Sequence, residues 1–201
     1  RSLAKAGLFE NALLRRFLTA AGQIPVEREG RGAVAYAAAV EAVRRGECVV
    51  VYPEGTITRD PDMWPMTGKT GAARIGLETG APVLPVGQWG AQQLLPPYSK
   101  RPHLVPRTKV TMSVGEPVDL EDLREKELTP EVVREAADRI LAAITAQLEE
   151  IRGEHAPAER YDMRVSGDPY KDRHTSDRKK SDRKKSDRKT SDRKDEDRKS
   201  A

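Results

Sequence analysis

The sequence is poor in several features that would define its class. It contains one cysteine, three histidines and only 4% aromatic residues among its 201 residues. One cysteine cannot form an internal disulfide, so a reducing compartment fits and a disulfide-stabilised secreted domain is excluded. No apolar run approaches the roughly 20 residues that a membrane-spanning helix needs. The chain begins with Arg1 and no charged-then-apolar signal segment follows, so we expect it to begin within a domain.

The net charge of +4 comes from the C-terminal end of the chain. Residues 171–201 hold 14 Lys and Arg against eight Asp and Glu, which leaves 22 basic and 24 acidic residues in 1–170. Ser-Asp-Arg-Lys repeats there every five residues from Ser176, with few apolar residues between. Such a segment buries too little apolar surface to offset chain entropy. We therefore expect a disordered mixed-charge tail over residues 153–201.

The surplus cations of this tail suggest a second interpretation, attraction to anionic lipid or nucleic acid. The interleaved Asp residues weaken both attractions. The rest of the chain has no basic stripe, which argues against nucleic acid as a partner.

The apolar pattern predicts alternating helices and strands. Helical spacing occurs over residues 3–21, 33–45, 70–79 and 129–151, while residues 48–52 and 82–87 fit buried strands and residues 108–114 a further strand. Cys48 lies in the first apolar run, so we interpret it as a core thiol. Strand, loop, helix, strand is the signature of the α/β class. We expect a single α/β domain over residues 1–152, with a mixed or mostly parallel sheet flanked by helices.

The end of the strand predicted at 48–52 carries the most informative motif, Tyr-Pro-Glu-Gly-Thr at residues 52–56. Open α/β sheets bind ligands at the carboxyl ends of their strands. Gly55 lets the backbone approach an anion, Thr56 offers a hydroxyl and an N–H, and Glu54 can orient a base or accept from a substrate hydroxyl. Taken alone, this short motif is better explained as a tight turn, because four such residues occur by chance.

Further blocks around this motif extend the pattern, and together they resemble the glycerolipid acyltransferase family of the lysophosphatidic-acid acyltransferase type. The resemblance runs in order from about residue 4 to residue 148. Besides the aromatic-Pro-Glu-Gly-Thr block, it rests on Gly22, Ile24 and Arg28, on residues 69–73 (Lys-Thr-Gly-Ala-Ala), on residues 82–87 (Pro-Val-Leu-Pro-Val-Gly), and on residues 115–118 (Gly-Glu-Pro-Val).

The resemblance implies an O-acyltransferase of phospholipid biosynthesis. The donor would be acyl-CoA or acyl carrier protein, and the acceptor 1-acyl-glycerol-3-phosphate or a related lysophospholipid. It implies no metal and no bound cofactor, and a peripheral place on the cytoplasmic side of the cell membrane. The alternative is a non-catalytic lipid- or acyl-carrier-binding protein that keeps the acceptor site.

The family's catalytic pair, a His followed five residues later by Asp, has no counterpart in this sequence. His103 is followed at that spacing by Thr108, and the other two histidines by Arg160 and Lys179. The family places this block upstream of the segment matching residues 3–9. We therefore expect a truncated chain rather than an inactive relative.

The resemblance also implies roles for cations near the motif. Arg28 would contact the acceptor phosphate, with Lys69 as a second candidate beside Gly55 and Thr56, and Glu54 would support the site. An exposed ion pair is the alternative for Arg28, and a surface cation for Lys69. The family has Arg directly after Glu-Gly-Thr, whereas Ile57 stands here, so Arg59 is a candidate substitute.

Two other features fit a structural explanation better than a site. Residues 60–62 (Asp-Pro-Asp) resemble part of a metal loop but have no further ligands beside them, so we interpret them as a turn. Trp64 and Trp89 would line an acyl groove or, as we prefer, pack in the core and anchor a loop.

Overall fold

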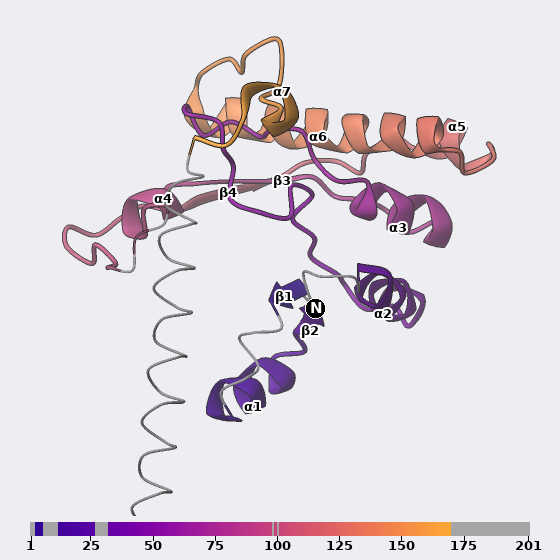
Figure 1. Cartoon of the computed structure of the whole chain (residues 1–201), viewed down its shortest axis with the longest axis horizontal. Helices are drawn as coiled ribbons and strands as arrows, with labels where there is room; N and C mark the ends of the chain where they lie inside the picture. The colour runs from indigo at the N-terminus through magenta and orange to yellow at the C-terminus, as the bar shows by residue number, and fades with distance from the viewer. Residues whose placement is uncertain (1–2, 6–11, 27–31, 98, 100, 170–201) are drawn as a thin grey trace, which may run out of the picture. The chain divides into compact units, whose positions relative to one another are not determined.

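The computed structural model describes residues 3–5, 12–26, 32–97, 99 and 101–169, and residues 170–201 lie outside it (Figure 1). The chain divides into two compact units, Arg1–Arg160 and Tyr161–Ala201. Among the described residues, no helix has the length and apolar character to cross a membrane. The disorder predicted for the tail falls mostly on residues outside the description, and the predicted boundary at residue 152 stays a prediction.

The first unit contains most of the described helices and strands. They are, in order, β1 (Leu3–Lys5), α1 (Ala12–Ala20), β2 (Ile24–Val26), α2 (Gly32–Arg44), α3 (Gly71–Thr79), β3 (Val86–Trp89), α4 (Ala91–Leu94), β4 (Thr111–Val114), α5 (Glu121–Arg124) and α6 (Pro130–Arg152). The second unit contains α7 (Met163–Ser166), where the Asp162 side chain caps the helix by accepting from the Arg164 N–H.

The N-terminal helix predicted over residues 3–21 is wrong at its beginning. Leu3–Lys5 is strand β1, which pairs in parallel with β2, and the helix begins only at Ala12. Leu3 matches the helical spacing of the later apolar residues by coincidence, because a three-residue strand is too short to show an alternation of its own. Strand β2 follows Gly22 directly, at Ile24–Val26.

The sheets confirm strands of mixed direction. β1 and β2 run parallel, whereas β3 and β4 run antiparallel, with Val86 opposite Val114 and Trp89 opposite Thr111. Among the described residues these are two separate two-stranded sheets. Helix α6 covers one face of the β3–β4 pair. A Cβ on Gly87 would come within 2.8 Å of the Gln147 Cβ, so only glycine permits this approach.

The two strands predicted as buried on both faces are partly wrong: residues 48–52 form only an isolated bridge at Val50, and residues 82–87 become a strand, β3, only from Val86. In residues 48–52 the burial alternates: Val49 and Val51 pack against the cluster formed by α2 and α3, whereas Tyr52 is 68% exposed. Cys48 is exposed, so it is not a core thiol. In residues 82–87, Leu84 and Val86 likewise remain exposed because α6 covers only the opposite face. One-sided packing exposes every second side chain of an extended segment.

The main core lies between α6, α3 and α5. Helix α6 begins as predicted, with the Thr129 side chain accepting from the Val132 N–H and Pro130 in the first turn, and ends at Gly153. Its apolar stripe faces α3 and α5, as the 3.6-residue spacing predicts. The cluster consists of Ala73, Leu77, Leu120, Leu123, Val133, Ala136, Ala137 and Ile140.

A smaller cluster ties α2 to α3 beside residues 49–51. Ala39 and Val40 of α2 pack against Ile75 of α3. Tyr36 donates a hydrogen bond to Glu78, and Arg44 pairs with the same carboxylate. The extended segment that leads to the Pro-Glu-Gly-Thr motif therefore rests on a helical layer.

Candidate functional site

The Pro-Glu-Gly-Thr motif forms a turn at the end of the extended segment. The Gly55 N–H donates to the Tyr52 carbonyl at 3.0 Å, and Gly55 has φ 65°, in the left-handed region. A side chain here would strain the backbone. Thr56 follows at a half-buried position. The glycine is therefore required by the shape of the turn itself.

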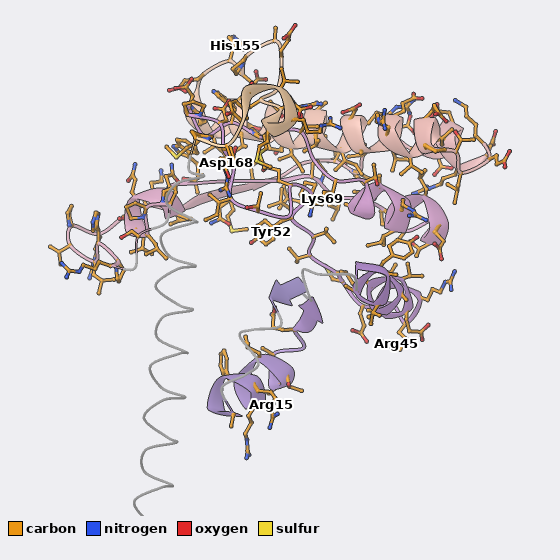
Figure 2. All side chains as sticks on the ribbon, in the orientation of Figure 1. Arg15, Arg45, Tyr52, Lys69, His155 and Asp168 are labelled. Atoms are coloured by element: carbon orange, nitrogen blue, oxygen red, sulfur yellow. The ribbon has the colours of Figure 1, made fainter. Side chains whose placement is uncertain are left out.

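Lys69 lies against this turn although it is 14 positions from Gly55 in the sequence. Its N–H donates to the Pro53 carbonyl at 2.8 Å. Its Nζ lies 3.3 Å from the position that a Cβ on Gly55 would occupy (Figure 2). The structure thus brings four predicted site residues, Glu54, Gly55, Thr56 and Lys69, to one turn. An exposed ammonium beside a glycine turn can bind an anion as a point charge.

Glu54 faces the loop that follows the motif. Its Oε2 accepts from the Met66 N–H at 3.2 Å. Burial raises the pKa of Glu54 to about 7, the hydrogen bonds from Met66 and with Thr58 lower it, and the charge of Asp60 raises it further. This carboxyl group therefore changes charge near neutral pH. Through the hydrogen bond from Met66, Glu54 links the motif to the end of the loop that follows it.

The loop over residues 57–66 is held by its own polar groups. Asp60 Oδ1 accepts from the N–H groups of Asp62, at 2.8 Å, and Trp64, at 3.2 Å. The Thr58 hydroxyl donates to the Trp64 carbonyl at 2.7 Å. These bonds have the form of an Asx turn, so the turn interpretation of residues 60–62 is confirmed.

Arg59 does not take the place of the missing arginine at position 57. Its side chain is only 6% exposed, and Nη1 donates to the Ile57 carbonyl at 3.2 Å. The guanidinium is used within the loop, because a buried cation needs polar partners close by. Ile57 itself is 48% exposed.

Arg152 is a structural residue that the sequence did not reveal. Its guanidinium carbon lies 3.7 Å from the ring centroid of Trp64 and 4.2 Å from that of Trp89. It also donates to the Asp62 carbonyl at 3.0 Å and pairs with Glu154. The two tryptophans thus anchor the loop to α6 and β3, as preferred over an acyl groove. The signal that could have found Arg152 is a single cation at the end of the apolar stripe of α6.

The remaining predictions concern Arg28 and the histidines. Arg28 falls in residues 27–31, outside the described residues, so its role stays a prediction. His155 is fully exposed in its side chain (Figure 2). His103 is also exposed. No group of three or more potential metal ligands occurs among the described residues.

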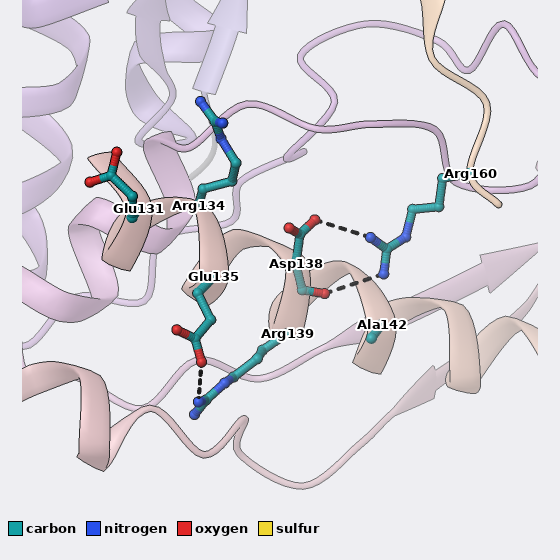
Figure 3. A pocket seen from close by; sticks show the side chains of 7 residues that line it. All are labelled: Glu131, Arg134, Glu135, Asp138, Arg139, Ala142 and Arg160. Atoms are coloured by element: carbon teal, nitrogen blue, oxygen red, sulfur yellow. Dashed lines mark hydrogen bonds and ion pairs between the residues drawn. The ribbon is translucent and has the colours of Figure 1, made fainter. Parts of the chain in front are cut away.

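A hollow on the outer side of α6 is a second surface feature (Figure 3). It has a volume of about 640 Å³ and is lined by Glu131, Arg134, Glu135, Asp138, Arg139, Ala142 and Arg160. Arg160 pairs with Asp138, and Arg139 pairs with Glu135. Three acidic side chains balance three basic ones, so the hollow has no surplus charge for an anionic ligand.

The known proteins to which this chain is similar are acyltransferases. A family model described as Acyltransferase matches residues 1–89, a range that contains all the predicted site residues. Two curated relatives are 1-acyl-sn-glycerol-3-phosphate acyltransferases. The chloroplast protein of Brassica napus is 30% identical over 49% of this chain and 28% of its own length. The Bacillus subtilis protein is 28% identical over 60% of this chain and 55% of its own length.

A solved structure shows the same fold. The 1-acyl-sn-glycerophosphate acyltransferase PlsC from Thermotoga maritima matches with a TM-score of 0.54 and 25% identity, over 78% of this chain and 58% of that chain. This chain thus spans about a quarter to three fifths of the lengths of these relatives.

The fold and the turn at residues 53–56 are those of an α/β domain similar to known acyltransferases. Residues 1–89 match the acyltransferase family model, and the chain is similar to two 1-acyl-sn-glycerol-3-phosphate acyltransferases and to the PlsC structure.

Proposed function

We propose that this protein takes part in the transfer of a fatty acyl group to the free hydroxyl of 1-acyl-glycerol-3-phosphate or a related lysophospholipid. The observation that carries the proposal is the Lys69 ammonium placed against the Gly55 turn, within the family's aromatic-Pro-Glu-Gly-Thr block. The names of the two curated relatives and of the solved structure support this acceptor. Both acyl-CoA and acyl carrier protein remain candidate donors.

The residues on this chain would bind and position the acceptor. Lys69 supplies a positive charge for the phosphate, and the Gly55 turn leaves the backbone open to the same anion. Arg28 is proposed as a second phosphate contact on the strength of its motif. Glu54 acts through the loop: by holding the Met66 N–H, it fixes the segment that follows the turn.

Proton removal from the acceptor hydroxyl requires a base that we do not assign to any of these residues. In the family a His oriented by an Asp performs this step. No histidine of the 201 residues has an Asp five positions later. The second candidate function is a lipid- or acyl-carrier-binding protein that keeps the acceptor site and performs no transfer.

We also propose that the protein works at the cytoplasmic face of the cell membrane, as a peripheral protein. The support is chemical: a lysophospholipid acceptor and a diacyl product both partition into a bilayer.

Acyl transfer from a labelled acyl-CoA, and separately from acyl carrier protein, to lysophosphatidic acid tests the proposal. The assay compares this chain with the chain joined to whatever natural sequence precedes Arg1. Labelled phosphatidic acid from either form supports acyl transfer. Binding of lysophosphatidic acid without product in both forms would favour the binding protein, and absence of both would contradict the acceptor site.

A further inference from the structure

The stretch between Glu78 and Glu116 has an unusual charge pattern for this sequence. Of all residues, 34% are charged, yet these 37 positions contain no Asp or Glu and four Lys or Arg. Three of the cations, Arg101, Arg107 and Lys109, lie in residues 101–110, which we call the basic–apolar loop. This loop precedes β4. The local charge is positive although the chain up to residue 170 is slightly acidic.

The same loop exposes large apolar side chains. Leu104 is 70% exposed and Val105 is 88% exposed, near the limit for a folded chain. The His103 N–H donates to the Leu94 carbonyl at 2.7 Å, which closes the base of the loop just before these two residues. Burying such side chains against the domain would be favourable, so their exposure indicates a partner surface.

The cations of the loop differ from the other arginines of the domain. Within the part of the chain that the structure describes, the side chains of Arg101, Arg107 and Lys109 enter none of the ion pairs. By contrast, Arg139 and Arg160 are each paired with carboxylates. Three unneutralised positive charges around two exposed apolar side chains suit an anionic surface with an apolar interior.

We infer that the basic–apolar loop docks the protein on an anionic lipid bilayer. Leu104 and Val105 enter the boundary between headgroups and acyl chains, while Arg101, Arg107 and Lys109 contact lipid phosphates. A second copy of the chain is disfavoured as the occupant, because two copies would bring like charges together. The inference deepens the proposed membrane location by naming the surface, and its test requires no acyl transfer.

Flotation of the full chain with vesicles tests this surface. One set of vesicles is pure phosphatidylcholine, and the other contains 30% phosphatidylglycerol. The apolar variant Leu104→Ser with Val105→Ser should bind anionic vesicles roughly tenfold more weakly. The charge variant Arg101→Gln, Arg107→Gln and Lys109→Gln should lose about fivefold per cation, the factor to which ~1 kcal/mol corresponds.

Matched controls carry the same chemical changes elsewhere. Val34→Ser with Leu128→Ser removes two apolar side chains that are 64% and 50% exposed. Arg15→Gln, Arg16→Gln and Lys126→Gln removes three cations. Both controls keep the basic tail and should bind within about threefold of the unaltered chain, since distant exposed charges are screened.

The expected result is loss of anionic binding in the loop variants and not in the controls. Equal binding by loop variants and controls would overturn the loop as the docking surface while leaving membrane location intact. A change in self-association of the loop variants by sedimentation velocity, without vesicles, would assign the surface to a second copy and overturn the lipid assignment. Absence of vesicle binding by the unaltered chain would also overturn it, whereas transfer to lysophosphatidic acid in detergent micelles judges the proposed function separately.

Discussion

Residues 53–69 and residues 101–110 are both irregular segments rich in proline and charge, but they use their polar groups in opposite ways. In the first, Glu54 and Asp60 accept backbone N–H groups and Trp64 is 5% exposed. In the second, the apolar side chains are exposed and the cations have no ion-pair partner within the described residues. The polar groups of residues 53–69 form hydrogen bonds within that segment, whereas the cations of residues 101–110 are exposed. Composition alone does not separate these two roles.

The largest effect is expected for Arg152, which anchors residues 53–69 to α6. Arg152→Ala should lower the free energy of unfolding by about 3 kcal/mol, because it removes stacking on both tryptophans and the hydrogen bond to the Asp62 carbonyl. Urea denaturation measures this loss. Arg152→Lys should recover part of it, since the charge remains and the planar stacking is lost. A cost below about 0.5 kcal/mol for Arg152→Ala would show that the loop is held by other contacts.

The next effect concerns ligand binding rather than stability. Lys69→Met should raise the Kd for lysophosphatidic acid roughly thirtyfold, the equivalent of about 2 kcal/mol for a charged hydrogen bond. The exposed Lys126→Met is the matched control and should leave the Kd unchanged. Isothermal titration gives both values. Equal weakening in the two variants would mean that only net charge matters.

A smaller effect is expected from Glu54 as pH changes. The pKa of about 7 in the folded protein lies above the ordinary value of 4.5, so the stabilisation that protonated Glu54 contributes is fully present below pH 4.5 and is lost as pH rises through 7. Glu54→Gln cannot lose a proton, so its unfolding free energy should lack this decline. Because the group is half-buried, we expect a difference of roughly 1–2 kcal/mol between pH 5 and pH 8. Parallel pH profiles for the two proteins would contradict a raised pKa.

The smallest effect is expected in the second segment. Leu104→Ser with Val105→Ser should change the free energy of unfolding by less than about 0.5 kcal/mol, because both side chains are exposed. Thermal unfolding followed by circular dichroism provides the check. A loss of 2 kcal/mol would show that these residues pack against the domain, and the contrast between the two segments would fail.

Much of the helical architecture could be predicted from the sequence. Thr129, Pro130 and Gly153 mark the ends of α6, and Gly80 ends α3, because capping and glycine C-caps depend on local chemistry. The α/β class was also predictable from the alternation of elements. Burial of the strands was not, since an apolar run does not reveal whether one or both faces are covered.

The candidate site was predictable only in part. The turn at residues 53–56 and Lys69 were found from motif and spacing, and the structure brings them together. Arg59 was a wrong substitute for the missing arginine, because its burial depends on the loop that folds around it. Arg152 was missed since its two tryptophan partners are 88 and 63 positions away in the sequence. Long-range stacking leaves no local pattern.

The most direct test of the acceptor site compares two ligands that differ only in the phosphate. Binding of lysophosphatidic acid and of monoacylglycerol with the same acyl chain would be measured for the unaltered chain and for Lys69→Met. We expect the unaltered chain to prefer the phosphate-bearing ligand by at least tenfold and Lys69→Met to lose most of this preference. Equal affinity for the two ligands in the unaltered chain would contradict a phosphate site at the Gly55 turn.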